Sequence, residues 1–162
     1  MRGEFFFMAI GGLGVSLAGF AGLIAALTPE QQRNSAVAQW RISRVVVWGL
    51  HTTLLGFGIV ALFALLGDET QTARVASGVA AMIFAIRSWR SSRPGPAWPD
   101  EPTRRYVIAL WAFELVVVLG NVIVGSVGYL HAIMIVFLAE AAAVFVAAVL
   151  EATAGPTVSR PD

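Results

Sequence analysis

The sequence contains no cysteine, and charged residues are scarce in it. Charged residues make up 13% of the 162 residues, against roughly 25% in typical soluble domains. The lack of cysteine excludes disulfides, thiol nucleophiles and cysteine-type zinc or iron–sulfur sites. The formal net charge of +1 gives no concentrated basic surface for binding phosphates, so we expect no nucleic-acid partner.

Apolar residues are in excess, at 57% of the chain. They form long runs, which predict an integral membrane protein with the lipid bilayer as its surroundings. Because the runs are continuous and lack a period of two, they indicate helices and not barrel strands. All basic residues are arginine and the chain is rich in Ala, Gly and Val. This composition suggests a GC-rich bacterial gene, so we expect a multi-pass protein of the bacterial cytoplasmic (inner) membrane.

Five apolar runs are candidate transmembrane helices, and they predict an all-α bundle that forms a single domain over residues 1–154. Each run is long enough, or nearly so, to cross a hydrocarbon core of about 30 Å. The third is the weakest, because Arg74 and Arg87 bracket a short apolar stretch. The predicted spans are about 5–27, 45–66, 72–89, 106–125 and 127–150.

The connecting segments carry distinct signals. Residues 29–43 mix Trp and Ile with Gln and Arg, which predicts an interfacial helix leading into the second span. Residues 90–104 include the stretch RPGPAWP, which is incompatible with a helix and predicts an extended loop. A short turn at residues 125–128 makes the last two spans an antiparallel hairpin. Residues 155–162 are expected to form a flexible tail.

The arginines predict the orientation of the chain. Most of them follow the first and third spans, so the positive-inside rule places these two segments in the cytoplasm. With five spans, the N-terminus is then outside and the C-terminus cytoplasmic. Removing the third span would put the two arginine-rich segments on opposite sides, which is a reason to keep it. The alternative, that residues 5–27 are a cleaved signal peptide, is less favoured because the run exceeds the usual apolar length of about 7–15 residues. The arginines that predict this orientation are Arg33, Arg41 and Arg44 after the first span, and Arg87, Arg90, Arg93, Arg104 and Arg105 at and after the end of the third span.

Small residues recur at intervals of four in the first span. Gly14, Ala18, Gly22 and Ala26 lie on one helix face. Such a face lets another helix approach closely. We interpret it as a packing face, either inside the bundle or toward a second copy or a membrane-complex partner.

A few polar residues inside the spans are candidates for function, because ionisable groups are costly in a bilayer. The candidates are His51, Arg87, Glu114 and Glu140. A rise of about 1.5 Å per residue places all four in the cytoplasmic half, where they are predicted to form one polar cluster. Asn121 lies seven residues after Glu114, on the same helix face.

Two interpretations of this cluster remain open. Buried polar pairs can fix helix register, often at a cost in stability. Alternatively, a carboxylate near a histidine suits proton relay or the passage of a small solute.

Enzymatic and cofactor functions have little support in the sequence. The two histidines, His51 and His131, are predicted to lie at different depths, about 15 Å apart along the membrane normal, which disfavours bis-histidine haem ligation. There is no Ser/His/Asp arrangement or histidine-rich metal motif, so we expect no catalytic residues, no metal site and no cofactor. Most tryptophans, including Trp40 and Trp48, are expected in the aromatic belts at the membrane boundaries. We therefore predict a non-enzymatic structural or accessory membrane subunit, with a small transporter or proton-coupled carrier as the alternative.

Overall fold

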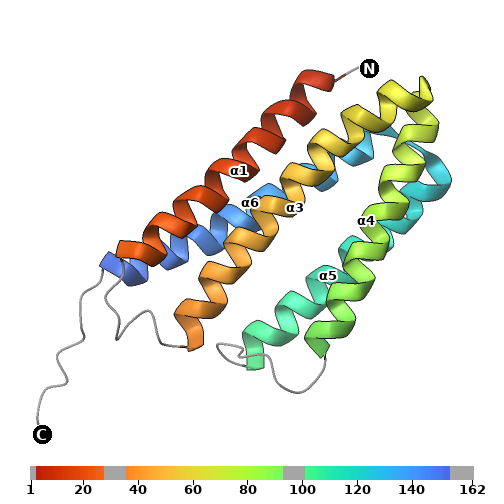
Figure 1. The fold of residues 1–162 in the computed structure, drawn as a ribbon. Coiled ribbons are helices and arrows are strands. Elements are labelled where there is room, and N and C mark those ends of the chain that lie inside the picture. The colour runs from red at the N-terminus through yellow and green to blue at the C-terminus, as the bar shows by residue number, and fades with distance from the viewer. Residues whose placement is uncertain (1–2, 28–35, 93–100, 154–162) are drawn as a thin grey trace, which may run out of the picture.

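The computed structural model describes residues 3–27, 36–92 and 101–153, and over these residues the chain forms five helices and no strand (Figure 1). The prediction of an all-α bundle is confirmed. Residues 28–35, most of the predicted extended loop (93–100) and the predicted flexible tail (155–162) lie outside the described residues. The helices are α1 (Glu4–Leu27), α3 (Ala36–Leu66), α4 (Glu69–Ser92), α5 (Glu101–Val124) and α6 (Val127–Thr153).

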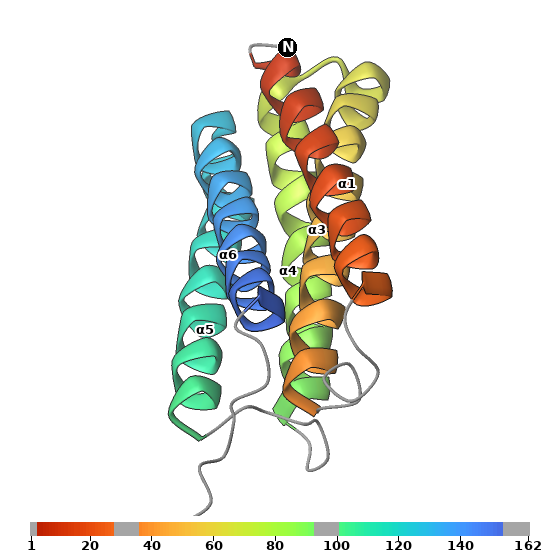
Figure 2. The ribbon, with the colours of Figure 1, turned by 90° about the vertical axis from the view of Figure 1, so that its left-hand side faces the viewer.

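The helices alternate in direction along the bundle (Figure 1, Figure 2). Helices α1, α4 and α6 run one way, and α3 and α5 run the other way. The last turns of α1, α4 and α6 therefore lie at the same end as the first turns of α3 and α5. We call this end the arginine end, because it carries Arg41, Arg90, Arg104 and Arg105, whereas Arg74 is near the opposite end.

Four of the five helices are long and apolar enough to cross a membrane. They are α1, most of α3, α5 from Arg104 onward, and α6 to Leu150. Helix α4 has 24 residues, as many as α1 and α5, and it packs against both α3 and α5. It is the least apolar of the five, which agrees with its position as the weakest predicted span.

The second predicted span is part of a longer helix in the structure. Helix α3 is one continuous helix of 31 residues from Ala36 to Leu66, so residues 36–43 of the predicted interfacial helix and the predicted span from Val45 belong to the same helix. Residues 36–44 contain neither Pro nor Gly, so nothing in this stretch interrupts the helix. At about 46 Å, α3 is longer than a hydrocarbon core of about 30 Å.

Glycines end the helices at the two short connections. Gly67 follows α3 with a φ of 68° and Gly125 follows α5 with a φ of 71°, a left-handed conformation that glycine adopts readily. Their amides donate to the carbonyl oxygens of Phe63 and Asn121, each at 2.8 Å. Asp68 then caps α4, since its carboxylate accepts a 2.6 Å hydrogen bond from the Gln71 amide.

Helices α1 and α3 pack through small residues. A Cβ on Gly14 would lie 2.5 Å from the carbonyl oxygen of Gly49, and a Cβ on Gly49 would lie 2.5 Å from that of Gly14 and 3.2 Å from the Cβ of Ala18. Thr53 of α3 also donates a 2.9 Å hydrogen bond to the carbonyl oxygen of Gly11 in α1. The first half of the predicted packing face is thus used inside the bundle, as one of the two interpretations expected.

The second half of that face is open. Nothing lies within 4 Å of a Cβ built on Gly22, and Gly22 and Ala26 are both exposed. Large apolar side chains are also exposed along the outer surface of every helix, for example Phe20, Leu54, Met82, Phe113 and Val146. Such a surface is typical of contact with lipid acyl chains.

Candidate functional site

An aromatic layer occupies the centre of the bundle. Trp48, Phe84, Trp111 and Phe137 come from α3, α4, α5 and α6, and all four are buried. The Trp48 ring centroid lies 5.8–6.1 Å from those of the other three, and the Phe84 and Phe137 centroids lie 4.8 Å apart. Aromatic pairs of this kind contribute about 0.5–1.5 kcal/mol each beyond area burial. Trp48 therefore belongs to the core, and its predicted place in a boundary belt is wrong.

Each ionisable residue of the predicted cluster follows one of these aromatic residues by three positions. The pairs are Trp48 and His51, Phe84 and Arg87, Trp111 and Glu114, and Phe137 and Glu140. Three residues rise by about 4.5 Å along a helix. Because α3 and α5 run opposite to α4 and α6, His51 and Glu114 lie on one side of the aromatic layer, and the backbones of Arg87 and Glu140 lie on the other. The four backbone positions therefore lie at two levels, on either side of the aromatic layer, and the meeting of their side chains in one cluster stays a prediction. The side chain of Arg87 lies outside the described part of the chain, so its contacts stay a prediction.

On the first level, His51 is held by its own helix. Its Nδ1 lies 2.7 Å from the carbonyl oxygen of Val47, and since a carbonyl only accepts, Nδ1 is the donor. The half-buried ring lines a small cavity of about 10 Å³ beside Leu55, Ala80 and Phe84. That is scarcely the space of one water molecule, so the cavity is too small to be a solute path.

Glu114 and Asn121 lie on the inner face of α5, where their exposed fractions are 5% and 1%. The Nδ2 of Asn121 donates to the hydroxyl of Ser77 on α4 at 2.9 Å, and its Oδ1 accepts from the Ser126 amide at 2.9 Å. Arg74 of α4 reaches the same region and donates to the carbonyl oxygen of Ile123 at 3.0 Å. Asn121 therefore fastens α5 to α4 and to the turn before α6.

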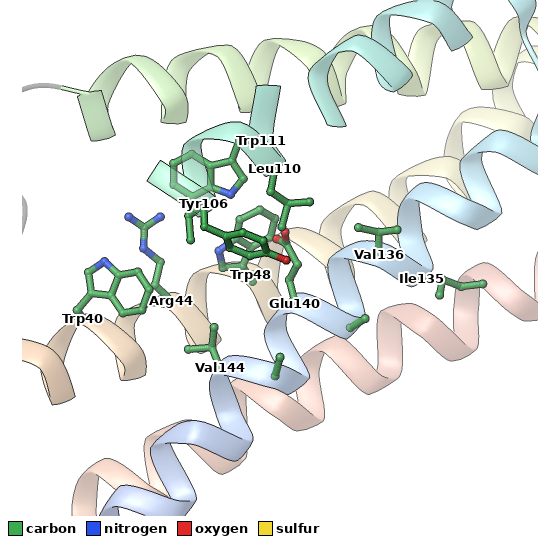
Figure 3. A pocket seen from close by; sticks show the side chains of 13 residues that line it. Trp40, Arg44, Trp48, Tyr106, Leu110, Trp111, Ile135, Val136, Glu140 and Val144 are labelled. Atoms are coloured by element: carbon green, nitrogen blue, oxygen red, sulfur yellow. The ribbon is translucent and has the colours of Figure 1, made fainter. Parts of the chain in front are cut away.

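The larger cavity is on the second level, between α3, α5 and α6 (Figure 3). Its volume is about 390 Å³, within the 300–1,000 Å³ typical of small-molecule pockets. Thirteen residues line it, and two of them are charged: Arg44 from α3 and Glu140 from α6. Of the predicted cluster, the structure brings only Glu140 to this cavity, among the described side chains.

Arg44 is held by aromatic rings at the wall of the cavity. Its guanidinium carbon lies 5.3 Å from the centroid of Trp40 and 4.9 Å from that of Trp111. Cation–π contacts at these distances contribute about 0.5–2 kcal/mol, most where water is excluded. Arg44 also interacts electrostatically with Glu140. Arg44 is not among the residues predicted for the site, because its place among other arginines is typical of a loop. Its signal was the spacing of four between Trp40, Arg44 and Trp48, which places all three on one helix face.

His131 lies away from both levels, as expected. Its ring stacks on Phe7 of α1 at 4.7 Å and meets the edge of Phe6 at 4.4 Å. These contacts join the first turns of α1 and α6, at the end opposite the arginine end.

The described residues bring together no group of three His, Asp or Glu side chains suited to hold a metal ion. The arrangement is instead a mostly apolar cavity with an arginine and a glutamate in its wall. Comparison with known proteins finds no family, no curated relative and no solved structure that this chain matches.

Proposed function

We propose that the chain crosses the bacterial cytoplasmic membrane five times, with the N-terminus outside and the arginine end in the cytoplasm. Two observations support α4 as the fifth span. Its 24 residues extend about 36 Å, and it runs antiparallel to α3 and α5, with which it packs. The concentration of arginines at one end supports the orientation.

The lack of cysteine makes this proposal easy to test, because a single introduced cysteine can be labelled without background. Gln71 and Arg90 are exposed residues near opposite ends of α4. A membrane-impermeant maleimide should label Gln71→Cys in intact bacterial cells and Arg90→Cys only after permeabilisation. Labelling of both variants from the same side would show that α4 does not cross the membrane.

We propose further that the protein is a non-enzymatic structural or accessory membrane subunit. The use of buried polar groups to join helices supports this. Thr53 bonds α3 to α1, Asn121 bonds α5 to α4, and Arg74 bonds α4 to α5. Such bonds fix helix register. Since Gly14 and Ala18 pack on α3, a partner helix approaching α1 by the same face would use Gly22 and Ala26.

The alternative is a small transporter or proton-coupled carrier. The cavity that contains both Arg44 and Glu140 supports it. In the wall of a lateral cavity, the carboxylate could take up and release a proton, and the guanidinium could bind an anionic solute during its passage.

Neutral substitutions separate the two functions. For a subunit, the Glu114→Gln and Glu140→Gln variants should assemble into the same complex in native membranes as the wild type. Reconstituted vesicles containing the wild type should then show no proton flux by a pH-sensitive dye. Wild-type flux that either substitution abolishes, in a variant that still folds, would establish the carrier and overturn the subunit.

A further inference from the structure

The cavity between α5 and α6 opens on the outer surface of the bundle. Several of its lining side chains are exposed: Tyr106 at 69%, Ile135 at 51% and Val136 at 39%. These residues belong to helices long and apolar enough to span a membrane. In a bilayer, the mouth of the cavity therefore faces acyl chains and not bulk water.

The two charged residues lie at different depths along the cavity. Arg44 is seven residues from the start of the α3 span at Val37, and Glu140 is ten residues from the end of the α6 span at Leu150. At about 1.5 Å per residue, these positions are roughly 10 Å and 15 Å from the arginine end. Side chains lean toward the N-terminus of their helix, which widens this difference, because α3 and α6 are antiparallel. Figure 3 shows the Arg44 guanidinium toward Trp40 and the Glu140 carboxylate farther along the cavity.

We propose that this cavity binds one anionic phospholipid from the leaflet at the arginine end, with the headgroup phosphate on Arg44 and an acyl chain in the cavity. A guanidinium matches a phosphate through paired charge-assisted hydrogen bonds. Trp40 and Trp111 already hold Arg44 in place, which lowers the entropic cost of binding. The other lining residues, except for Glu140, supply apolar and aromatic surface for the acyl chain.

A cationic ligand fits the cavity less well. The aromatic rings and the carboxylate would attract an organic cation, but Arg44 already lies against Trp111 and interacts with Glu140. A second cation would be repelled by Arg44. An anionic headgroup is attracted by Arg44 and repelled by Glu140, which lies deeper in the cavity. Arg44 therefore favours an anionic ligand over a cationic one, and Glu140 favours the reverse.

Brominated lipids give a direct test, because Trp40, Trp48 and Trp111 all line the cavity. The full chain is placed in nanodiscs, and quenching of tryptophan fluorescence is titrated with phosphatidylglycerol brominated in the acyl chain. Phosphatidylcholine with the same brominated chain serves as the reference lipid. We expect the wild type to prefer phosphatidylglycerol, and Arg44→Gln to reduce this preference by about tenfold, as for loss of a charged hydrogen bond. Glu140→Gln should increase the preference severalfold.

Matched controls separate binding in the cavity from general surface charge. Arg105→Gln and Glu101→Gln remove the same charges at the same end, from exposed side chains outside the cavity. Each should change the preference by less than about twofold. Ala139→Leu fills the cavity without changing any charge, and should reduce quenching by both lipids.

Three results would overturn the proposal. The first is a wild type with no preference for phosphatidylglycerol, and the second is an equal change of this preference in Arg44→Gln and Arg105→Gln. The third is a preference that rises in Arg44→Gln and falls in Glu140→Gln. This third result would mean that the cavity binds a cation. If circular dichroism shows that Arg44→Gln does not fold, two other results still decide the outcome. They are the direction in which Glu140→Gln changes the preference for phosphatidylglycerol, and the loss of quenching in Ala139→Leu. The proposal does not depend on the subunit or carrier function, since lipid binding is measured on the isolated chain.

Discussion

Two pairs of helices in this bundle pack in opposite ways. Helices α1 and α3 approach so closely that a methyl group on Gly14 or Gly49 would meet a backbone oxygen at 2.5 Å. Helices α5 and α6 are joined by only two residues, yet with α3 they enclose a cavity of about 390 Å³. Proximity along the chain therefore does not decide how closely two helices pack.

Side-chain size explains the difference. The α1–α3 contact has glycine on both sides, so dispersion acts over a long contact, and Thr53 adds a hydrogen bond. On the α5 side of the cavity, Tyr106 and Trp111 project from the helix, whereas α6 offers Ala139 and Ala143. Large residues on one helix hold the backbones apart, and the alanines opposite do not fill the remaining space. The first pair holds the bundle together, and the second leaves room for a ligand.

The largest effect is expected from adding a methyl group to the close contact. Gly14→Ala and Gly49→Ala should each lower the free energy of unfolding by about 1–3 kcal/mol, because the backbones must separate. Unfolding by SDS, followed by circular dichroism, measures this. Gly22→Ala is the matched control, since nothing lies within 4 Å of its Cβ. The control should be neutral or stabilising by up to about 1 kcal/mol, through helix propensity. Equal losses in all three variants would contradict the close packing of α1 on α3.

The same comparison can be made on α6 alone with two alanines. Ala141 is completely buried, and Ala139, two residues earlier, lines the cavity. Ala141→Leu should cost about 1–3 kcal/mol through overpacking, whereas Ala139→Leu should stay within about 0.5 kcal/mol of the wild type. The SDS unfolding assay applies here as well. A similar loss in both variants would mean that the cavity does not accept added volume.

A smaller effect is expected where α5 is fastened to α4. The Asn121 amide donates to Ser77 at 2.9 Å across this interface. A double-mutant cycle with Asn121→Ala and Ser77→Ala should give a coupling of about 0.6 kcal/mol, and at most about 1.7, as for other hydrogen bonds between membrane helices. In the control cycle, Ser16→Ala takes the place of Ser77→Ala, since the Ser16 hydroxyl donates to the Gly12 carbonyl oxygen within its own helix. A coupling indistinguishable from zero would assign the α4–α5 contact to packing alone.

Helix positions follow from the sequence more readily than depths within the bundle do. Continuous apolar runs and glycine or proline breaks predict both ends of α1 and α6 and the last residue of α3 to within a few residues, because these signals are local. Helix α3 begins at Ala36, inside the interfacial helix predicted over residues 29–43, and continues into the predicted span without a break. The arginine and glutamine residues of this stretch are good helix formers and do not end a helix.

The candidate site is only partly predictable, because local signals in the sequence do not give the depth of a residue within the bundle. Glu140 could be recognised because a carboxylate stands out in an apolar run. Arg44 could not be found by that rule, since it lies among other arginines in the sequence. The aromatic layer requires the relative register of four helices, which no single helix encodes. The levels of the four ionisable positions depend on both that register and the direction of each helix.

The smallest effect is expected in the first turn of α5, beside the mouth of the cavity. The Glu101 carboxylate accepts hydrogen bonds from Arg105 at 3.2 Å and Arg104 at 3.3 Å, and these contacts hold its pKa below the usual value of 4.5. A lowered pKa in the folded state means that the stabilisation is present above pH 4.5 and is lost as pH falls through the folded-state pKa. Because the carboxylate is exposed and the arginine charges are screened, this loss should be slight. An NMR titration of Glu101 should therefore show a lowered pKa that rises toward 4.5 in Arg105→Gln, and an unchanged pKa in that variant would show that Arg105 does not act on the carboxylate.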